Sequence, residues 1–142
     1  KGPYEALILA SIVEKETGVA NERAEIAGVF TRRLALGMRL QTDPTVIYGL
    51  GAEFDGNLTR RQLRDDDNQF NTYRIAGLPP TPIALPGKEA IVASLNPKDG
   101  EALYFVAKGD GSHAFSRTLS EHEENVRRYQ IKRRKDYRSS PK

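Results

Sequence analysis

The residue of this chain whose position best suits acid–base chemistry is Glu16, near the end of a helix predicted for residues 4–17. An apolar stripe runs along that helix at a period of about 100° per residue. The stripe consists of Ala6, Ile8, Leu9, Ile12 and Val13. Glu16 follows one turn later on the same stripe, whereas Glu14 points the opposite way, toward a more polar side. That side holds Leu7, Ala10 and Ser11.

A carboxyl group that faces apolar surroundings loses hydration, and its pKa rises toward the range in which it can act as a general acid. The inward position predicted for Glu16 therefore indicates acid–base catalysis by a single carboxyl group. The periodicity leaves one alternative open. The stripe could end before Glu16 and leave the carboxylate in solvent beside Gly18.

Other sets of chemistry-bearing residues give no support for a metal or cofactor site. The chain has no cysteine, which excludes thiolate metal sites, cysteine nucleophiles and disulfides. His113 and His122 are nine residues apart on different predicted elements, a poor spacing for metal ligands. The acidic run 65–67 is more typical of a loop than of a metal site. No serine stands in a nucleophile elbow, and no glycine-rich phosphate loop is present. We therefore expect neither a metal nor a cofactor.

Helix start and stop signals recur along the first half of the chain. A second helix is predicted from an N-cap at Asn21 to a stop at Gly37. The Thr-Asp-Pro pattern at 42–44 predicts a third helix with proline at its first position, ending near Gly49 and Gly51.

The second half of the chain combines short helices, a loop and a hairpin. Further helical segments are predicted at 59–63, at 88–95, and from an N-cap at Ser120 to about residue 135. The prolines between Gly77 and Gly87 predict a long, ordered, extended loop. Segments 102–107 and 113–116 have strand composition, and the turn residues between them predict a hairpin. The expected fold is therefore α+β: a mainly helical single domain with a small β-hairpin and a proline-rich loop.

The composition limits the classes of partner. The chain has 142 residues, a formal net charge of +3 and 38% hydrophobic residues, which suits one globular domain. No apolar stretch approaches the roughly 18 residues of a membrane span, and no signal peptide is evident. Basic residues gather between 127 and 138, which indicates either a solvated helix end and tail or attraction to an anionic polymer. A nucleic-acid-binding domain would explain that charge but not the inward glutamate, so we expect no nucleic acid partner.

Several ordered motifs resemble those of one known family. Segment 10–17 reads ASIVEKET and resembles the catalytic signature of the endolytic murein transglycosylases, the YceG-like family. Segment 40–49, LQTDPTVIYG, is similar to that family's second signature. Shorter matches follow, and together the resemblance runs from about residue 6 to residue 129. The matching segments are 71–73, 77–80, 83–84 with 86–87, 104–106, the pair His113 and Phe115, and 121–122.

The resemblance implies an activity. Members of this family cut the β-1,4 bond between N-acetylmuramic acid and N-acetylglucosamine inside glycan strands without water, which leaves 1,6-anhydromuramyl ends. It also implies that Glu16, the second glutamate of the Glu-Lys-Glu triplet, is the catalytic residue. A non-catalytic peptidoglycan-binding module is the alternative, and only Glu16 and its surroundings separate the two.

The resemblance also implies substrate-binding residues. Gln41, Asp43, Tyr48, Asn71 and Tyr73 stand in the matched motifs and are expected to orient the sugar or hold Glu16. Alternatives remain open for several of them. Asp43 could only cap its helix, and Asn71 and Tyr73 could brace the proline-rich loop. Glu14 is expected to be a solvated surface residue or to modulate Glu16 electrostatically.

The resemblance also sets expectations for organisation and location. Family members usually carry an N-terminal membrane anchor and a LysM-like module before this region, and neither is expected here. We expect a catalytic domain at 1–131 and a basic tail at 132–142. The implied location is the periplasmic face of the cytoplasmic (inner) membrane. The implied partners are glycan strands and the penicillin-binding synthases of cell-wall elongation.

Overall fold

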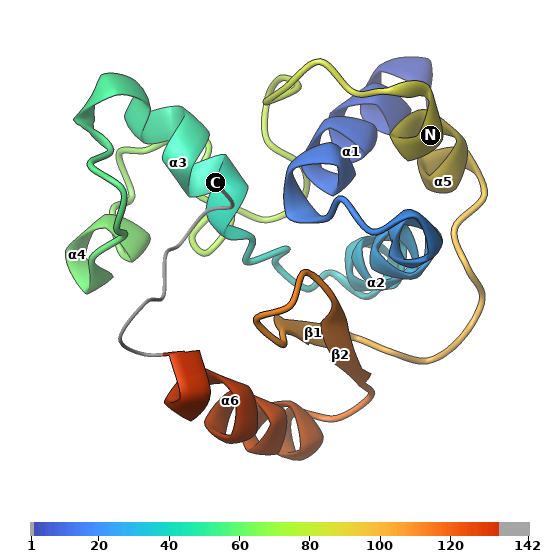
Figure 1. Ribbon diagram of the computed structural model, residues 1–142. Coiled ribbons are helices and arrows are strands. Elements are labelled where there is room, and N and C mark those ends of the chain that lie inside the picture. Colours follow the sequence, from blue (N-terminus) through green and yellow to red (C-terminus); the bar gives the residue numbers. More distant parts are fainter. Residues whose placement is uncertain (1, 134–142) are drawn as a thin grey trace.

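Three helices, α1 (Pro3–Glu16), α2 (Arg23–Leu36) and α5 (Lys88–Leu95), lie side by side and contain most of the buried core (Figure 1). The computed structural model describes residues 2–133. The core includes Ile12 and Val13 of α1, Phe30 of α2 and Ala90 of α5. Each large side chain removed from water in this way contributes about 1.5–3 kcal/mol. The core therefore gives α1 a rigid support.

The polar side predicted for α1 is largely buried, which corrects the sequence expectation. Ala10 and Ser11 are fully buried, because α1 packs against both α2 and α5 and the proline-rich loop bonds to Ser11. The hydroxyl of Ser11 donates to the Ile8 carbonyl at 2.6 Å and accepts the Ile83 amide at 3.0 Å. Periodicity alone assigns this serine to the solvent side. In the fold it is buried, and its hydroxyl accepts the hydrogen bond of a loop amide that would otherwise have no partner.

The loop from Gly77 to Gly87 has no regular secondary structure, as its prolines predicted. It is held along α1 by side-chain hydrogen bonds. The Tyr4 hydroxyl lies 3.5 Å from the Pro80 carbonyl, and the Glu14 carboxylate accepts the Gly87 amide at 2.9 Å. Glu14 is thus a half-buried anchor of the loop rather than a solvated surface residue.

A second group of helices extends to the left of α1 in Figure 1. It comprises α3 (Asp43–Leu50), a 3-10 turn η2 (Gly51–Glu53) and the single-turn helix α4 (Arg60–Leu63). Pro44 stands in the first turn of α3, as predicted, and Thr59 caps α4 through the Gln62 amide. Gly49 is required by packing, because a Cβ there would lie 1.9 Å from the Asn68 side-chain oxygen. The α3 axis therefore passes very close to the segment that follows α4.

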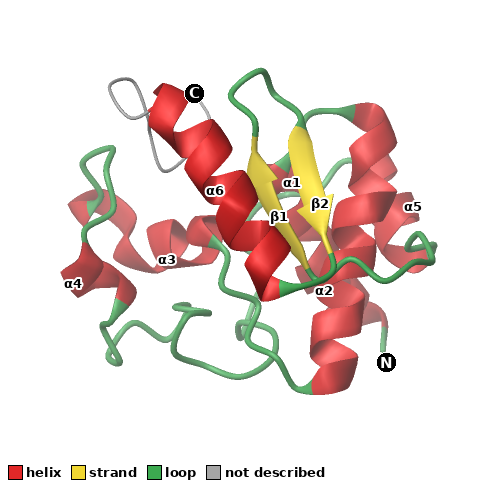
Figure 2. Ribbon diagram, turned by 90° about the horizontal axis from the view of Figure 1, so that it is seen from below, coloured by secondary structure: helices red, strands yellow, loops and turns green. Residues whose placement is uncertain are grey.

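The predicted hairpin is confirmed and packs against the C-terminal helix α6 (Leu119–Arg133) (Figure 2). Strands β1 (Tyr104–Ala107) and β2 (His113–Ser116) pair antiparallel, with Phe105 opposite Phe115. The expected N-cap at Ser120 is wrong, because α6 begins earlier and the Thr118 hydroxyl accepts the Glu121 amide at 3.1 Å. The predicted end of this helix at about residue 135, and most of the predicted tail 132–142, lie outside the described residues.

The start of α2 also differs from the expectation. A 3-10 turn, η1 (Ala20–Glu22), precedes the helix, and Asn21 is not its N-cap. Glu22 occupies the cap position without a capping side-chain bond, because its carboxylate binds His113 instead. The predicted stop at Gly37 is confirmed by its left-handed φ of 76°. The side chain at the cap position thus makes a tertiary contact with the hairpin instead of a local cap.

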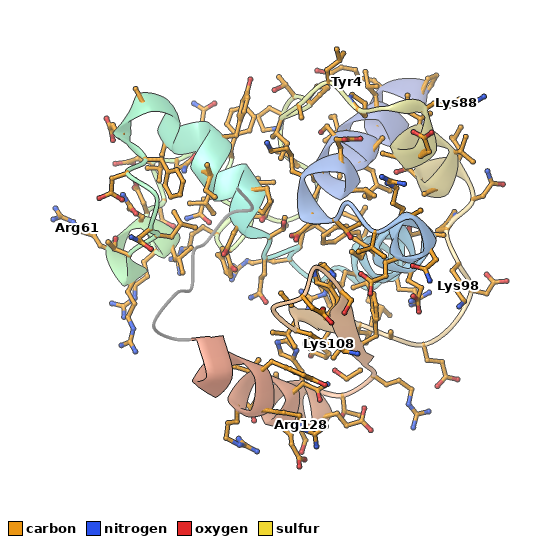
Figure 3. All side chains as sticks on the ribbon, viewed as in Figure 1. Tyr4, Arg61, Lys88, Lys98, Lys108 and Arg128 are labelled. Atoms are coloured by element: carbon orange, nitrogen blue, oxygen red, sulfur yellow. The ribbon has the colours of Figure 1, made fainter. Side chains whose placement is uncertain are left out.

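The charged surface is spread over several elements. Figure 3 shows Arg61, Lys88, Lys98 and Arg128 at different edges of the molecule. No helix between residues 2 and 133 has both the length and the apolar character that crossing a membrane requires.

Candidate active site

An open cleft of about 1420 Å³ runs along the ends of several elements around Glu16. Its walls come from the C-terminal end of α1, the start of α3, residues 83–85 of the proline-rich loop, the hairpin and α6. Four predicted site residues line it together with Glu16: Gln41, Asp43, Tyr48 and Tyr73. An elongated polymer could therefore lie across these residues.

Glu16 is the last residue of α1 and is only partly exposed, toward the cleft. Its pKa is raised from 4.5 to about 7, chiefly because burial removes water from the carboxyl group. A hydrogen bond from Thr42 opposes this shift, and the nearby charge of Asp43 adds to it. The negative end of the α1 dipole also disfavours an ionised group there. Near neutral pH, a large fraction of Glu16 can therefore carry a proton.

Thr42, which the sequence reasoning missed, fixes the Glu16 carboxyl group. Its hydroxyl donates a hydrogen bond to Oε2 of Glu16. Three buried threonines form a closed ring behind it: the Thr42 amide donates to Thr72 Oγ1 at 3.0 Å. Thr72 Oγ1 lies 2.8 Å from Thr45 Oγ1, which donates to the Thr42 carbonyl at 2.8 Å. The ring uses only the backbone amide and carbonyl of Thr42, so its hydroxyl can donate to Glu16.

Asp43 and Tyr73 form a polar pair beside Glu16. The Tyr73 hydroxyl donates to Asp43 Oδ1 at 2.6 Å. Burial raises the pKa of the Asp43 carboxyl group, and the bond from Tyr73 partly opposes that rise. Asp43 therefore does more than begin α3, because its charge also acts on Glu16.

Gln41 and Tyr48 are exposed on the cleft surface. Gln41 has a left-handed φ of 52°, and its amide donates to the Thr72 carbonyl at 3.2 Å. Tyr48 is 47% exposed and packs edge-on against Phe70 with ring centroids 4.9 Å apart. Both side chains can meet a ligand in the cleft.

Asn71 does not line the cleft. It is fully buried, and its amide nitrogen donates to three carbonyls at the end of α4 and beyond, at 3.0–3.3 Å. Its side-chain oxygen accepts the Tyr73 amide at 3.0 Å. These contacts brace the turn that carries Thr72 and Tyr73 rather than the proline-rich loop.

Replacing Asn71 with alanine is expected to destabilise the domain by about 2–3 kcal/mol, because several buried backbone groups lose their partner. Urea unfolding of the parent and the variant measures this difference. Gln69→Ala is the matched control, since Gln69 is exposed two residues earlier. Equal midpoints for all three proteins would contradict the bracing role.

Arg33 is a second buried polar residue that the sequence reasoning missed. It stands on the buried side of α2 with Ile26, Val29 and Phe30, at the same helical spacing that singled out Glu16 in α1. It lines the cleft, and its guanidinium lies 4.9 Å from the centre of the Tyr104 ring. The signal for Arg33 was present in the sequence, as a charge on an apolar stripe.

Glu22 and His113 join the core to the hairpin. The Glu22 carboxylate accepts the His113 backbone amide at 2.9 Å, and Nδ1 of the His113 ring lies 2.8 Å from the other carboxylate oxygen. Both side chains are about nine-tenths buried. Within residues 2–133, no three histidine or acidic side chains come together in a way that could hold a metal ion. His113 thus links a wall of the cleft to Glu22.

Comparisons with known proteins give consistent similarities. A model described as the YceG-like family matches residues 1–128. A Bacillus subtilis (strain 168) protein named endolytic murein transglycosylase is 40% identical over 129 residues, covering 89% of this chain and 34% of the relative. A Streptococcus pneumoniae serotype 2 protein of the same name is 34% identical over 126 residues, covering 86% and 23%.

A solved structure is also similar. The crystal structure of a yceG-like protein from Listeria monocytogenes superposes with a TM-score of 0.77 at 44% identity, covering 85% of this chain and 38% of that one. The chain thus spans about a third or less of the curated relatives it matches.

Proposed function

The chain belongs to the YceG-like family, and from that premise we propose that it is a lytic transglycosylase that cuts the glycan strands of murein from within. The resemblance predicted from its motifs is confirmed by the family match. The observation that carries the proposal is one carboxyl group, Glu16, with a pKa of about 7 in an open cleft.

A single carboxyl group suffices for this reaction. Ordinary glycosidases use two, one as acid and one as nucleophile or base. In the proposed reaction, protonated Glu16 gives its proton to the leaving glycosidic oxygen of N-acetylglucosamine as that oxygen's bond to C1 of N-acetylmuramic acid breaks. The 6-hydroxyl oxygen of the same N-acetylmuramic acid then bonds to C1, and its proton passes to the Glu16 carboxylate. Glu16 ends as it began, and no water is consumed.

The neighbours of Glu16 have supporting roles in this proposal. Thr42 orients the carboxyl group and steadies it once it has lost its proton, because a hydroxyl donor favours the charged form. An ionised Asp43 would favour the positive charge that develops at C1 and would keep Glu16 protonated beforehand. Tyr73 holds Asp43 in place.

Product analysis tests the reaction type. Purified glycan strands are incubated with the chain, and the fragments are identified by mass spectrometry. Anhydromuramyl ends are expected. Reducing ends would mean hydrolysis and would call for a second carboxylate. Binding without cleavage would favour the alternative, a non-catalytic glycan-binding module.

The pH dependence of cleavage follows from the raised pKa of Glu16. The reaction starts from the protonated acid, so kcat/KM is expected to be level in weakly acidic solution and to fall above pH 7, by about tenfold per unit. Initial rates between about pH 5.5 and about pH 9 check this. A descending limb near pH 4.5, the ordinary value for a glutamate, would contradict an acid role for buried Glu16.

The wider setting of the activity is also part of the proposal. The named relatives are much longer than this chain. We place the activity at the periplasmic face of the cytoplasmic membrane, beside the penicillin-binding synthases that make new strands. Co-purification of those synthases with the full-length protein would test that partnership.

A further inference from the structure

Arg33 is a buried charge that is rigidly held at the cleft. It is 6% exposed, and two of its nitrogens bind backbone carbonyls. Nε donates to Leu103 and Nη1 to Arg39, each at 2.7 Å. These bonds fix the plane of the guanidinium against the Tyr104 ring. The side chain is thus preorganised before any ligand arrives.

The charge of Arg33 has no counter-ion among residues 2–133, where none of the ion pairs involves it. Its Nη2 makes no hydrogen bond to the described residues. Burial lowers the pKa of the guanidinium, the direction expected for a desolvated cation that lacks a carboxylate. Buried charges are normally paired, so a missing partner points to a ligand.

The surroundings of Arg33 connect it to the Glu16 side of the cleft. Its charge interacts with Tyr104, which stacks on His122 of α6 with centroids 5.1 Å apart. It also interacts with Tyr73, which holds Asp43 beside Glu16. Arg33 therefore lines the same cleft as Glu16 and packs on its hairpin wall.

We propose that Arg33, backed by the Tyr104 ring, is a subsite for a carboxylate of the muramyl residue or of its peptide stem. This inference rests on the proposed function, since it deepens the choice of substrate. A planar guanidinium binds a carboxylate through parallel hydrogen bonds, and an aromatic face beside it suits the apolar part of a sugar or peptide.

The carboxylate has two sources in murein. Strands stripped of their peptides carry a free lactyl carboxylate on each muramyl sugar. Intact strands have that group in an amide bond and present the carboxylates of the peptide stem. Amidation with carbodiimide and ammonia neutralises either source without changing the length of the strand.

The experiment measures binding to a Glu16→Gln background, so that strands are not cut. Four ligands are compared: intact and stripped strands, each before and after amidation. Arg33→Gln is expected to weaken binding of at least one charged strand by about 10- to 100-fold and to leave the amidated strands within about twofold. The strand type whose binding weakens, intact or stripped, shows which carboxylate Arg33 binds. Arg33→Lys keeps the positive charge but not the paired donors of the guanidinium, so its affinity for the charged strand should fall between those of the parent and of Arg33→Gln.

Arg32→Gln is the matched control. Arg32 also binds backbone carbonyls just before β1, those of Ala102 at 2.8 Å and Lys98 at 3.0 Å, but it does not line the cleft. It is expected to change none of the four affinities. Thermal unfolding of each variant separates a loss of fold from a loss of the subsite.

The inference is overturned if the parent binds charged and amidated strands equally, or if Arg33→Gln and Arg33→Lys, while folded, weaken all four ligands alike. Its failure is distinct from failure of the proposed function. Charge-dependent binding through Arg33 by a chain that never cuts strands would keep the subsite and discard the lyase. Cleavage that is indifferent to amidation would do the reverse.

Discussion

Replacing Glu16 with glutamine is expected to lower the rate of strand cleavage by about 10²–10⁴-fold while the fold and glycan binding remain. Glutamine has nearly the same shape and can still accept the bond from Thr42, but it has no proton to give and cannot take one back. The measurement is the amount of anhydromuramyl ends released per unit time from purified strands.

Glu14→Gln is the control for this experiment. Glu14 is on the same helix and lines the same cleft, but its carboxylate holds the Gly87 amide. A glutamine oxygen can still accept that bond, so cleavage is expected to change by no more than a few-fold. Comparable losses in both variants would assign the effect to general damage at the end of α1, and an active Glu16→Gln protein would refute the mechanism.

Replacing Thr42 with valine is expected to lower kcat by about 10- to 100-fold and to move the descending limb of the pH profile to higher pH. The hydroxyl orients the Glu16 carboxyl group, and its hydrogen bond lowers the pKa of that group. Without it, Glu16 is mispositioned and also harder to ionise. Rates between about pH 5.5 and about pH 9 measure both effects.

Two comparisons make this prediction specific. Thr42→Ser keeps the hydroxyl and should restore most of the rate and the parent's pH profile. Asp43→Asn removes a charge that raises the pKa of Glu16, so its limb should move the other way, to lower pH. Shifts in the same direction for Thr42→Val and Asp43→Asn would show that Glu16 is not the group being titrated.

Glu16 and most helices were predictable because their signals are local. The register of one helix placed the carboxyl group on the buried side, and Pro44, Thr59 and Gly37 marked helix ends that the structure confirms. These features depend on neighbours within one or two turns. The turn residues between the two strands likewise predicted the hairpin.

The misses have a common physical cause, which is contact between distant segments. The bond from Thr42 to Glu16 spans 26 residues, and Glu22 meets His113 across 91, so no local pattern reveals either. Ser11 is buried where a loop amide more than seventy residues away bonds its hydroxyl.

Arg33 is a different kind of miss. Its position on an apolar stripe was visible in the sequence, but a buried arginine usually finds a carboxylate elsewhere in the chain. Only the folded arrangement reveals that the residues described here supply none.

The burial of Glu16 also makes the stability of the domain depend on pH. Its pKa in the folded state, about 7, is above the ordinary 4.5, so the folded chain holds the proton more tightly than the unfolded chain. The stability gained from that proton is complete below about pH 4.5 and is lost as the pH rises through 7. In alkaline surroundings, the group that prepares the domain for catalysis becomes a charge that the fold accommodates poorly. At alkaline pH, an inactive glutamine variant would therefore have the higher free energy of unfolding, so the acid needed for catalysis lowers the stability of the fold.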